Sequence, residues 1–262
     1  MRENPVFAAA ARTAAAAFHL IYPVHCPFCD RILTGEEEER LVCADCFEKL
    51  QFADDPVCMK CGRPLFSSAE EFCPQCRTKQ HYYSQARSLL VYRGDTGHSL
   101  NRLKSANRRD HAAFYAHYMA ESYGSWIRER GIDTIVPVPL YPEKKRERGY
   151  NQAEILARQV AGETGILTDE NILLKVRDTR QQKRLNAAER RENLRGAFAV
   201  RAVREELPDG SCCLVSTALG RRILLVDDIY TTGATADMAA KALMDAGAQA
   251  VYVLTAATVQ GA

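Results

Sequence analysis

Apolar and polar positions follow a regular alternation from about residue 85 to the end of the chain. Short apolar runs alternate with longer segments in which apolar residues recur every three or four positions. The runs predict strands and the longer segments predict helices, because these are the periods of the two structures. The run that begins at Arg222 is apolar without interruption to Val226, which is typical of a strand buried on both faces of a parallel sheet. Strands are expected at 89–92, 135–140, 172–176, 222–226 and 250–257, and helices at 151–163 and 234–246, the last ending at Gly247.

Strands that alternate with helices in this way predict an α/β domain with a mostly parallel sheet flanked by helices. The 262 residues are 47% hydrophobic and 26% charged, which excludes a disordered chain, a collagen-like fibre and a protein with many membrane spans. The net charge of +2 says little about partners. We expect three parts: an N-terminal helix over 1–24, a cysteine-rich module over 25–80 and the α/β domain over 85–262.

The N-terminal segment is rich in alanine between positions 8 and 17 and apolar just after them. A secretion signal has a basic start and an unbroken apolar centre, whereas here Glu3 lies beside Arg2 and Arg12 interrupts the run. No stretch reaches the roughly 18 apolar residues that a membrane-spanning helix needs. We therefore expect a short helix that packs on the rest of the protein, a cytoplasmic location and no stable insertion into a membrane.

Eight of the ten cysteines fall in four Cys-x-x-Cys pairs within residues 26–76. Paired cysteines in a reducing compartment indicate metal ligands before disulfides. Each pair lets two thiolates reach one ion from a tight turn, and two pairs complete a tetrahedral site. Soft thiolates suit zinc or an iron–sulfur cluster, and the near-regular spacing favours zinc. The pairs are Cys26/Cys29, Cys43/Cys46, Cys58/Cys61 and Cys73/Cys76.

Eight ligands predict two structural Zn²⁺ ions in a double zinc ribbon. Consecutive pairing places the first two pairs on one ion and the last two on the other, while an interleaved, cross-braced pairing is the alternative. A site closed by four thiolates leaves no position for catalysis, so the module is expected to act as a scaffold or to present a surface to DNA or protein. The slightly acidic composition of this region favours a scaffold. Cys212 and Cys213 lie outside the pattern and are expected in a strand of a hairpin over 203–221.

The segment 223–235 runs Ile-Leu-Leu-Val-Asp-Asp-Ile-Tyr-Thr-Thr-Gly-Ala-Thr, an apolar strand that ends in two carboxylates and a loop that opens a helix. The backbone N–H groups of such a loop and the helix N-terminus form an anion site suited to a phosphate monoester. Gly233 allows close backbone approach, and the threonines add hydroxyl donors. Asp227 and Asp228 can accept hydrogen bonds from a ribose diol or help to hold Mg²⁺. The candidate binding residues are Asp227, Asp228, Thr231, Thr232, Gly233, Ala234 and Thr235.

This segment resembles the binding motif of the type I phosphoribosyltransferases, which bind phosphoribosyl pyrophosphate (PRPP) with magnesium. It lacks the Gly-Lys-Ser/Thr of a Walker-type loop. Two further segments resemble the ComF family: 136–140 with 146–152 is similar to its pyrophosphate-loop region, and 179–198 is similar to its flexible loop. With the cysteine module in front, the resemblance covers the chain from about 26 to 258. It implies ligand contacts by Arg148, Asn151, Gln152, Gln182, Arg190 and Asn193.

The resemblance implies a type I phosphoribosyltransferase-like fold, binding of PRPP with Mg²⁺, and a role in natural transformation or the use of external DNA, with competence proteins as partners. The family's lysine segment appears here at 103–109, where Lys104 is a weaker candidate for phosphate binding. Glutamine-dependent amidotransfer is not expected, because no cysteine follows Met1 to act as the nucleophile. Asn151 and Gln152 have an alternative role as the first turn of a helix without ligand contact.

Basic residues gather in two stretches, 144–148 and 175–195, which would both lie at the carboxyl edge of the sheet, where open α/β folds bind ligands. A pyrophosphate or a DNA backbone suits that charge, and solvated loop charge is the alternative. Three functions stay open. The chain is a phosphoribosyltransferase with an unidentified acceptor, a non-catalytic component of the uptake machinery that binds single-stranded DNA, or a regulator that senses PRPP without consuming it.

Overall fold

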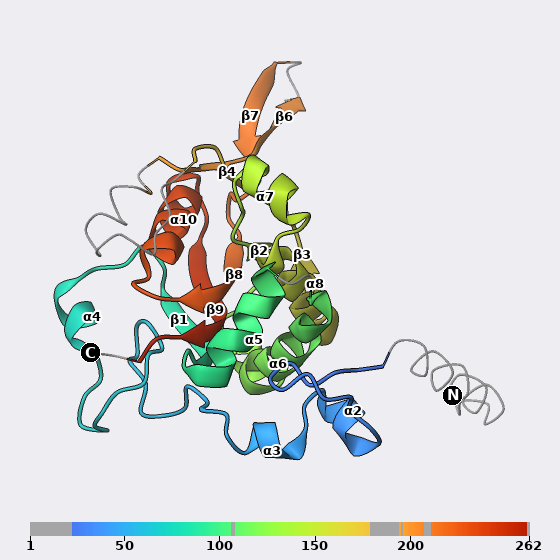
Figure 1. Cartoon of the computed structure of the whole chain (residues 1–262). Coiled ribbons are helices and arrows are strands. Elements are labelled where there is room, and N and C mark those ends of the chain that lie inside the picture. The colour runs from blue at the N-terminus through green and yellow to red at the C-terminus, as the bar shows by residue number, and fades with distance from the viewer. Residues whose placement is uncertain (1–22, 106–107, 179–193, 195, 207–210, 261–262) are drawn as a thin grey trace, which may run out of the picture. The chain divides into compact units, whose positions relative to one another are not determined.

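Figure 1 shows the computed structural model of the chain, which describes residues 23–105, 108–178, 194, 196–206 and 211–260. The chain divides into two compact units, Met1–Leu50 and Gln51–Ala262. The helix predicted over 1–24 lies almost entirely outside the described residues. The predicted limits of the cysteine-rich module, 25–80, and of the α/β domain, 85–262, stay predictions. No helix in the described part of the chain is both long enough and apolar enough to cross a bilayer.

The second unit is built on a parallel sheet of five strands among the described residues, in the order β1-β9-β8-β2-β3. Every neighbouring pair is parallel, and in the centre Val226 lies between Pro137 on one side and Leu254 on the other. This confirms the predicted mostly parallel sheet. The strands are β1 (Gln85–Val91), β2 (Thr134–Pro137), β3 (Leu167–Thr168), β8 (Arg222–Tyr230) and β9 (Ala250–Thr258).

Helices cover both faces of this sheet, as strands that are apolar throughout require (Figure 1). Along β8, Ile223 and Leu225 alternate with Leu224 and Val226, and all four side chains are fully buried. Ile223 and Leu225 share a core with the apolar face of α10, while α8 and α6 pack on each other and on the sheet. The helical segments that follow β1 are α5 (Gly94–Ser105), the 3₁₀ turn η1 (Arg109–His111), α6 (Ala112–Glu129), α7 (Pro142–Arg148), α8 (Gln152–Thr164) and α10 (Ala234–Asp245).

Two short antiparallel pairs lie outside the main sheet. The strand predicted at 172–176 is β4 (Leu173–Lys175), and it pairs with β5 (Phe198–Val200) instead of joining the parallel strands. The predicted hairpin over 203–221 consists of β6 (Ala202–Glu206) and β7 (Cys212–Ser216), which places Cys212 and Cys213 in a strand as expected. Figure 1 shows β6 and β7 projecting from the sheet.

The first unit contains the first two cysteine pairs and, within its described residues, the short helices α2 (Glu36–Arg40) and α3 (Ala44–Phe47). The second unit begins with the other two pairs and α4 (Pro74–Thr78). In this second unit Cys58, Cys61 and Cys73 are buried in the same core as the α10 face of the sheet. The cysteine-rich ribbons and the parallel sheet with its flanking helices together confirm the predicted fold class.

Residues that precede and follow Cys58 cover the outer edge of β1, the end strand of the sheet. The Ala53 N–H donates to the carbonyl oxygen of Leu89 at 2.8 Å, and the Val91 N–H donates to that of Gln51 at 2.7 Å. Further along the same edge, the Ala86 N–H donates to the carbonyl oxygen of Lys60 at 2.8 Å. Backbone groups that an edge strand would otherwise present to solvent are therefore paired within the unit.

Candidate functional site

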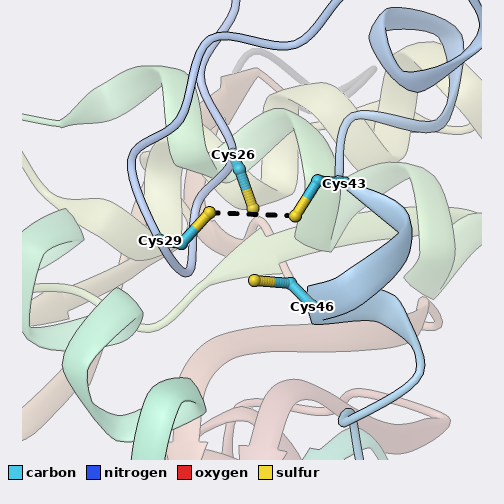
Figure 2. Close-up of side chains that lie close together, drawn as sticks. All are labelled: Cys26, Cys29, Cys43 and Cys46. Carbon is cyan, nitrogen blue, oxygen red and sulfur yellow. Dashed lines mark hydrogen bonds between the residues drawn. The ribbon is translucent and has the colours of Figure 1, made fainter.

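The first cysteine cluster is formed by two turns that point four sulfur atoms at one centre (Figure 2). Cys26 and Cys29 lie in a loop closed by a hydrogen bond from the Cys26 N–H to the Arg31 carbonyl oxygen, at 2.8 Å. Cys43 is the N-cap of α3, and Cys46 lies within that helix. All four sulfur atoms lie within 4.8 Å of one another, and those of Cys29 and Cys43 are 3.7 Å apart. This is the donor set and spacing of a tetrahedral zinc site.

The second cluster repeats the arrangement inside the second unit. Cys58, Cys61, Cys73 and Cys76 bring their sulfur atoms within 4.8 Å of one another. Gly62 follows Cys61 with a φ of +70°, and a Cβ there would lie 2.9 Å from the Cα of Arg87 on β1, so the turn requires glycine. The pairs are grouped consecutively and not interleaved, and each of the two four-cysteine clusters fits the binding of one Zn²⁺ ion.

The two carboxylates of the acidic motif lie near the carboxyl end of β8, at the point where the chain direction across the sheet reverses. From β8 the chain crosses to β9 on one side, and from β2 it crosses to β3 on the other. Open α/β sheets bind ligands in the crevice above such a switch point. The strand runs to Tyr230, four residues beyond the predicted end, because its pairing with β9 continues from Asp227 opposite Thr255 to Tyr230 opposite Thr258. Asp227 and Asp228 consequently belong to the strand itself.

Asp228 is the meeting point of three segments that are far apart in the sequence. Its side chain is buried, and its Oδ2 lies 2.6 Å from the Nζ of Lys104 at the end of α5. The same oxygen accepts a hydrogen bond from the Nε2 of Gln152, the first residue of α8, at 3.3 Å. Arg148 in turn donates to the Oε1 of Gln152. The acidic motif, the lysine segment and the predicted pyrophosphate-loop region thus converge on one carboxylate.

The charges of this cluster affect one another. Burial is the largest influence on Asp227, and the neighbouring Asp228 carboxylate adds to it, so that the pKa of Asp227 is raised to about 8. Burial opposes the charged form of Lys104, but the Asp228 carboxylate outweighs it and the pKa of Lys104 is raised. A nearby cation stabilises the ionised form of a carboxyl group whose pKa is raised, so this end of β8 favours a ligand that brings positive charge.

The loop after β8 has the backbone geometry of an anion site. Gly233 is the N-cap of α10 with a φ of +71°, and its carbonyl oxygen accepts from the Asp237 N–H at 2.8 Å. The Ala234 N–H donates to the Thr232 hydroxyl oxygen at 3.4 Å. Thr231, Thr232 and Thr235 are half-buried. The N-terminus of a twelve-residue helix and these hydroxyl groups suit a phosphate monoester.

The other predicted residues near this loop are held by neighbours within the protein. Asn151 is buried, accepts from the Ala153 N–H at 3.1 Å as the N-cap of α8, and donates to the Val138 carbonyl oxygen at 3.0 Å. The basic stretch at 144–148 lies in α7, where Lys145 pairs with the Glu154 carboxylate at 2.7 Å. Gln182, Arg190 and Asn193 lie outside the described residues. The ligand contacts predicted for all of these residues stay predictions.

Sequence reasoning undervalued Lys104 and missed the residues on the opposite side of the loop. Asp237, on α10, is buried and contacts Lys79 at 2.8 Å and His81 at 3.3 Å. The Tyr230 hydroxyl lies 2.7 Å from that of Tyr83. The signal for Asp237 was an acidic residue at a position of the α10 segment where the apolar periodicity predicts a buried side chain.

Comparisons with known proteins place the chain in a family. The model of the double zinc ribbon domain family matches residues 17–77. The DNA utilization protein YhgH of Salmonella typhimurium is 30% identical over 200 residues, which cover 75% of this chain and 82% of that protein. Competence protein F of Haemophilus influenzae is 28% identical over 80% of this chain and 94% of its own length. The chain belongs to the ComF family.

Two further comparisons concern another competence protein and a solved structure. Competence protein ComFC of Bacillus subtilis is 26% identical over 87% of the chain and 91% of its own length. A purine phosphoribosyltransferase from Pyrococcus horikoshii aligns in structure with 55% of this chain and 74% of its own, at 14% identity and a TM-score of 0.31.

Proposed function

We propose that this ComF-family protein binds PRPP with Mg²⁺ at the carboxyl end of β8 and serves in natural transformation or the use of external DNA. The observation that carries the proposal is the convergence of Lys104, Gln152 and the acidic pair beside a glycine-capped helix N-terminus. The convergence lies at the switch point of a parallel sheet, where a ribose phosphate ligand is expected. The names of the relatives support the second half of the proposal.

Each part of PRPP has a matching group on the protein. The 5-phosphate would accept hydrogen bonds from the backbone N–H groups and hydroxyl groups of residues 231–235. The ribose diol would donate to Asp227 and Asp228, and Arg148 would attract the pyrophosphate. Mg²⁺, when bound, neutralises charge on the pyrophosphate and favours its departure. Lys104 holds the Asp228 carboxylate in place until the ligand arrives.

The proposal includes transfer of phosphoribose to an acceptor of unidentified class. Displacement at C1 of the ribose depends on positioning and on stabilising the charge of the leaving pyrophosphate, and both are functions of the residues around the switch point. We also propose that the protein acts in the cytoplasm, because the eight clustered thiolates require a reducing compartment.

The test of PRPP binding is titration calorimetry of zinc-loaded protein with magnesium and PRPP. We expect a micromolar Kd, equivalent to about −8 kcal/mol. Asp227→Asn with Asp228→Asn should weaken binding at least about a hundredfold, because the diol and the cation lose both carboxylates. The matched control is Asp245→Asn at the exposed end of α10, where the carboxylate pairs with Lys241 at 2.6 Å. Absence of binding by the unmodified protein would overturn the proposal.

The affinity for magnesium-PRPP should increase with pH. Asp227 binds a diol or a cation best as a carboxylate, and its raised pKa keeps the acid form present up to about pH 8. Affinity should therefore be low near pH 6, rise through the raised pKa and level off above it. Calorimetry over this range measures the slope, and the Asp227→Asn variant supplies the control, since any slope it retains belongs to the ligand's own phosphates. Equal slopes in the two proteins would contradict a role for Asp227.

A further inference from the structure

The segment that leaves the second cysteine cluster, residues 79–83, contacts both ends of the loop that follows β8. One contact is with α10, just after the loop. Asp237 lies in the first turn of that helix and is buried. Its Oδ2 lies 2.8 Å from the Nζ of Lys79, and its Oδ1 accepts from the Tyr82 N–H at 2.9 Å. Burial opposes ionisation of Asp237, but contacts from His81, Lys79 and the Tyr82 N–H outweigh it and its pKa is lowered.

His81 joins this carboxylate to a metal ligand. Its side chain is fully buried, with Nδ1 3.3 Å from the Oδ1 of Asp237. On the other side of the ring, Nε2 lies 3.5 Å from the sulfur atom of Cys76. One imidazole therefore spans from a cysteine of the second cluster to the first turn of α10. A residue that contacts a metal-binding cysteine in this way orients the cysteine and links its position to the surrounding structure.

The second contact is with Tyr230, just before the loop. The His81 ring stacks on Tyr83 with centroids 4.7 Å apart, and the Tyr83 hydroxyl is 2.7 Å from the Tyr230 hydroxyl. Both tyrosines are buried, and the Tyr230 hydroxyl lies directly against Gly233. The guanidinium of Arg63, between Cys61 and Cys73, lies 5.4 Å from the centre of the Tyr230 ring. The residues on both sides of the loop 231–235, Tyr230 and Asp237, are thus held by the same ribbon.

We propose that His81 is a positioning residue that couples the second zinc site to the phosphate loop, so that zinc and magnesium-PRPP bind cooperatively. The coupling is the contact chain from Cys76 through His81 to Asp237 and, through Tyr83, to Tyr230. The second ribbon is then part of the ligand site without touching the ligand. This inference rests on the proposed function for its ligand, but the effect of His81 on the loop does not require any ligand to bind.

The test compares His81→Phe with the unmodified full-length protein. Phenylalanine keeps a ring to stack on Tyr83 and removes both polar contacts. The zinc content should stay at two per chain, because all eight cysteines are intact. Hydrogen–deuterium exchange of the amides at 231–237 should become about tenfold faster, and the affinity for magnesium-PRPP should fall by a similar factor, within the usual range of coupling between sites. His98→Phe, an exposed position of α5, is the matched control.

Reciprocity adds a measurement that a purely structural role would not change. If the two sites are coupled, saturating magnesium-PRPP lowers the Kd of one zinc, measured by equilibrium competition with a chromogenic chelator, by the same factor, about tenfold. His81→Phe should abolish this effect. If His81→Phe fails to fold, Tyr83→Phe, which removes only the hydroxyl contact with Tyr230, replaces it in every measurement.

The outcomes separate this inference from the proposed function. Unmodified protein that binds no PRPP refutes the proposed function, and the exchange of 231–237 without ligand then decides the role of His81. Amide exchange, affinity for magnesium-PRPP and zinc affinity in His81→Phe that match those of the His98→Phe control overturn the coupling.

Discussion

Cys61→Ser should release the second zinc and lower the free energy of unfolding of the second unit by about 4 kcal/mol or more, a loss expected only for core or metal-site changes. Structural zinc sites contribute their binding energy to folding, and three of the four cysteines here lie in the main core. Cys61 itself is 1% exposed, against 0% for Cys58 and 3% for Cys73. Chemical denaturation followed by circular dichroism, with zinc content measured on the same samples, checks the prediction.

The control for this experiment is Cys212→Ser. Cys212 is an exposed thiol on β7, outside both clusters, so its replacement should change the free energy of unfolding by less than about 0.5 kcal/mol. Retention of two zinc ions and of the original denaturation midpoint by Cys61→Ser would show that the second cluster is not a structural metal site.

Gly233→Ala should abolish measurable magnesium-PRPP binding and lower the free energy of unfolding by about 2 kcal/mol. The φ of +71° disfavours any side chain, by about 1–2 kcal/mol. A Cβ at this position would also lie 2.6 Å from the Cζ of Tyr230 and would overlap its hydroxyl. Tyr230 is held by Tyr83 and cannot move away without breaking their hydrogen bond, so the loop must change shape. Calorimetric titration and thermal unfolding measure the two effects.

Gly162→Ala is the matched control, because Gly162 is an exposed glycine within α8 with no atom near the position of a Cβ. Alanine there should raise helix stability by up to about 1 kcal/mol and leave binding unchanged. A Gly233→Ala protein that binds as tightly as Gly162→Ala would exclude the loop from the ligand site.

The parts of the structure that follow from local patterns were predictable. The run from Arg222 to Val226 indicates a strand buried on both faces, because successive side chains of a strand point to opposite faces and the run is apolar on both. The strand β8 confirms it. Likewise, four cysteine pairs at near-regular spacing indicate the metal ligands, because a spacing of two residues lets both thiolates of a pair bind the same ion. Both signals are contained in a short window of sequence.

Contacts between distant segments left no such signal. Lys104 and Asp228 are separated by more than a hundred positions, and nothing near either residue indicates the other. The segment at 172–176 has the composition of a strand, but composition does not say which partner it pairs with. The position of Asp237 predicts a buried carboxylate, but His81 resembles an ordinary loop residue and nothing near either residue indicates the other. Their role depends on the fold that places them together.

The segment that pairs with the outer edge of β1 links zinc binding at the second cluster to self-association of the protein. Residues 51–53 and Lys60 occupy the hydrogen-bonding positions along that edge, and this segment leads directly into the turn of Cys58 and Cys61. Because the metal site holds that turn, loss of zinc is expected to free this segment from the edge of β1. The bared edge is then a template for a strand from a second chain. Loss of zinc is therefore expected to favour edge-to-edge assembly of this protein.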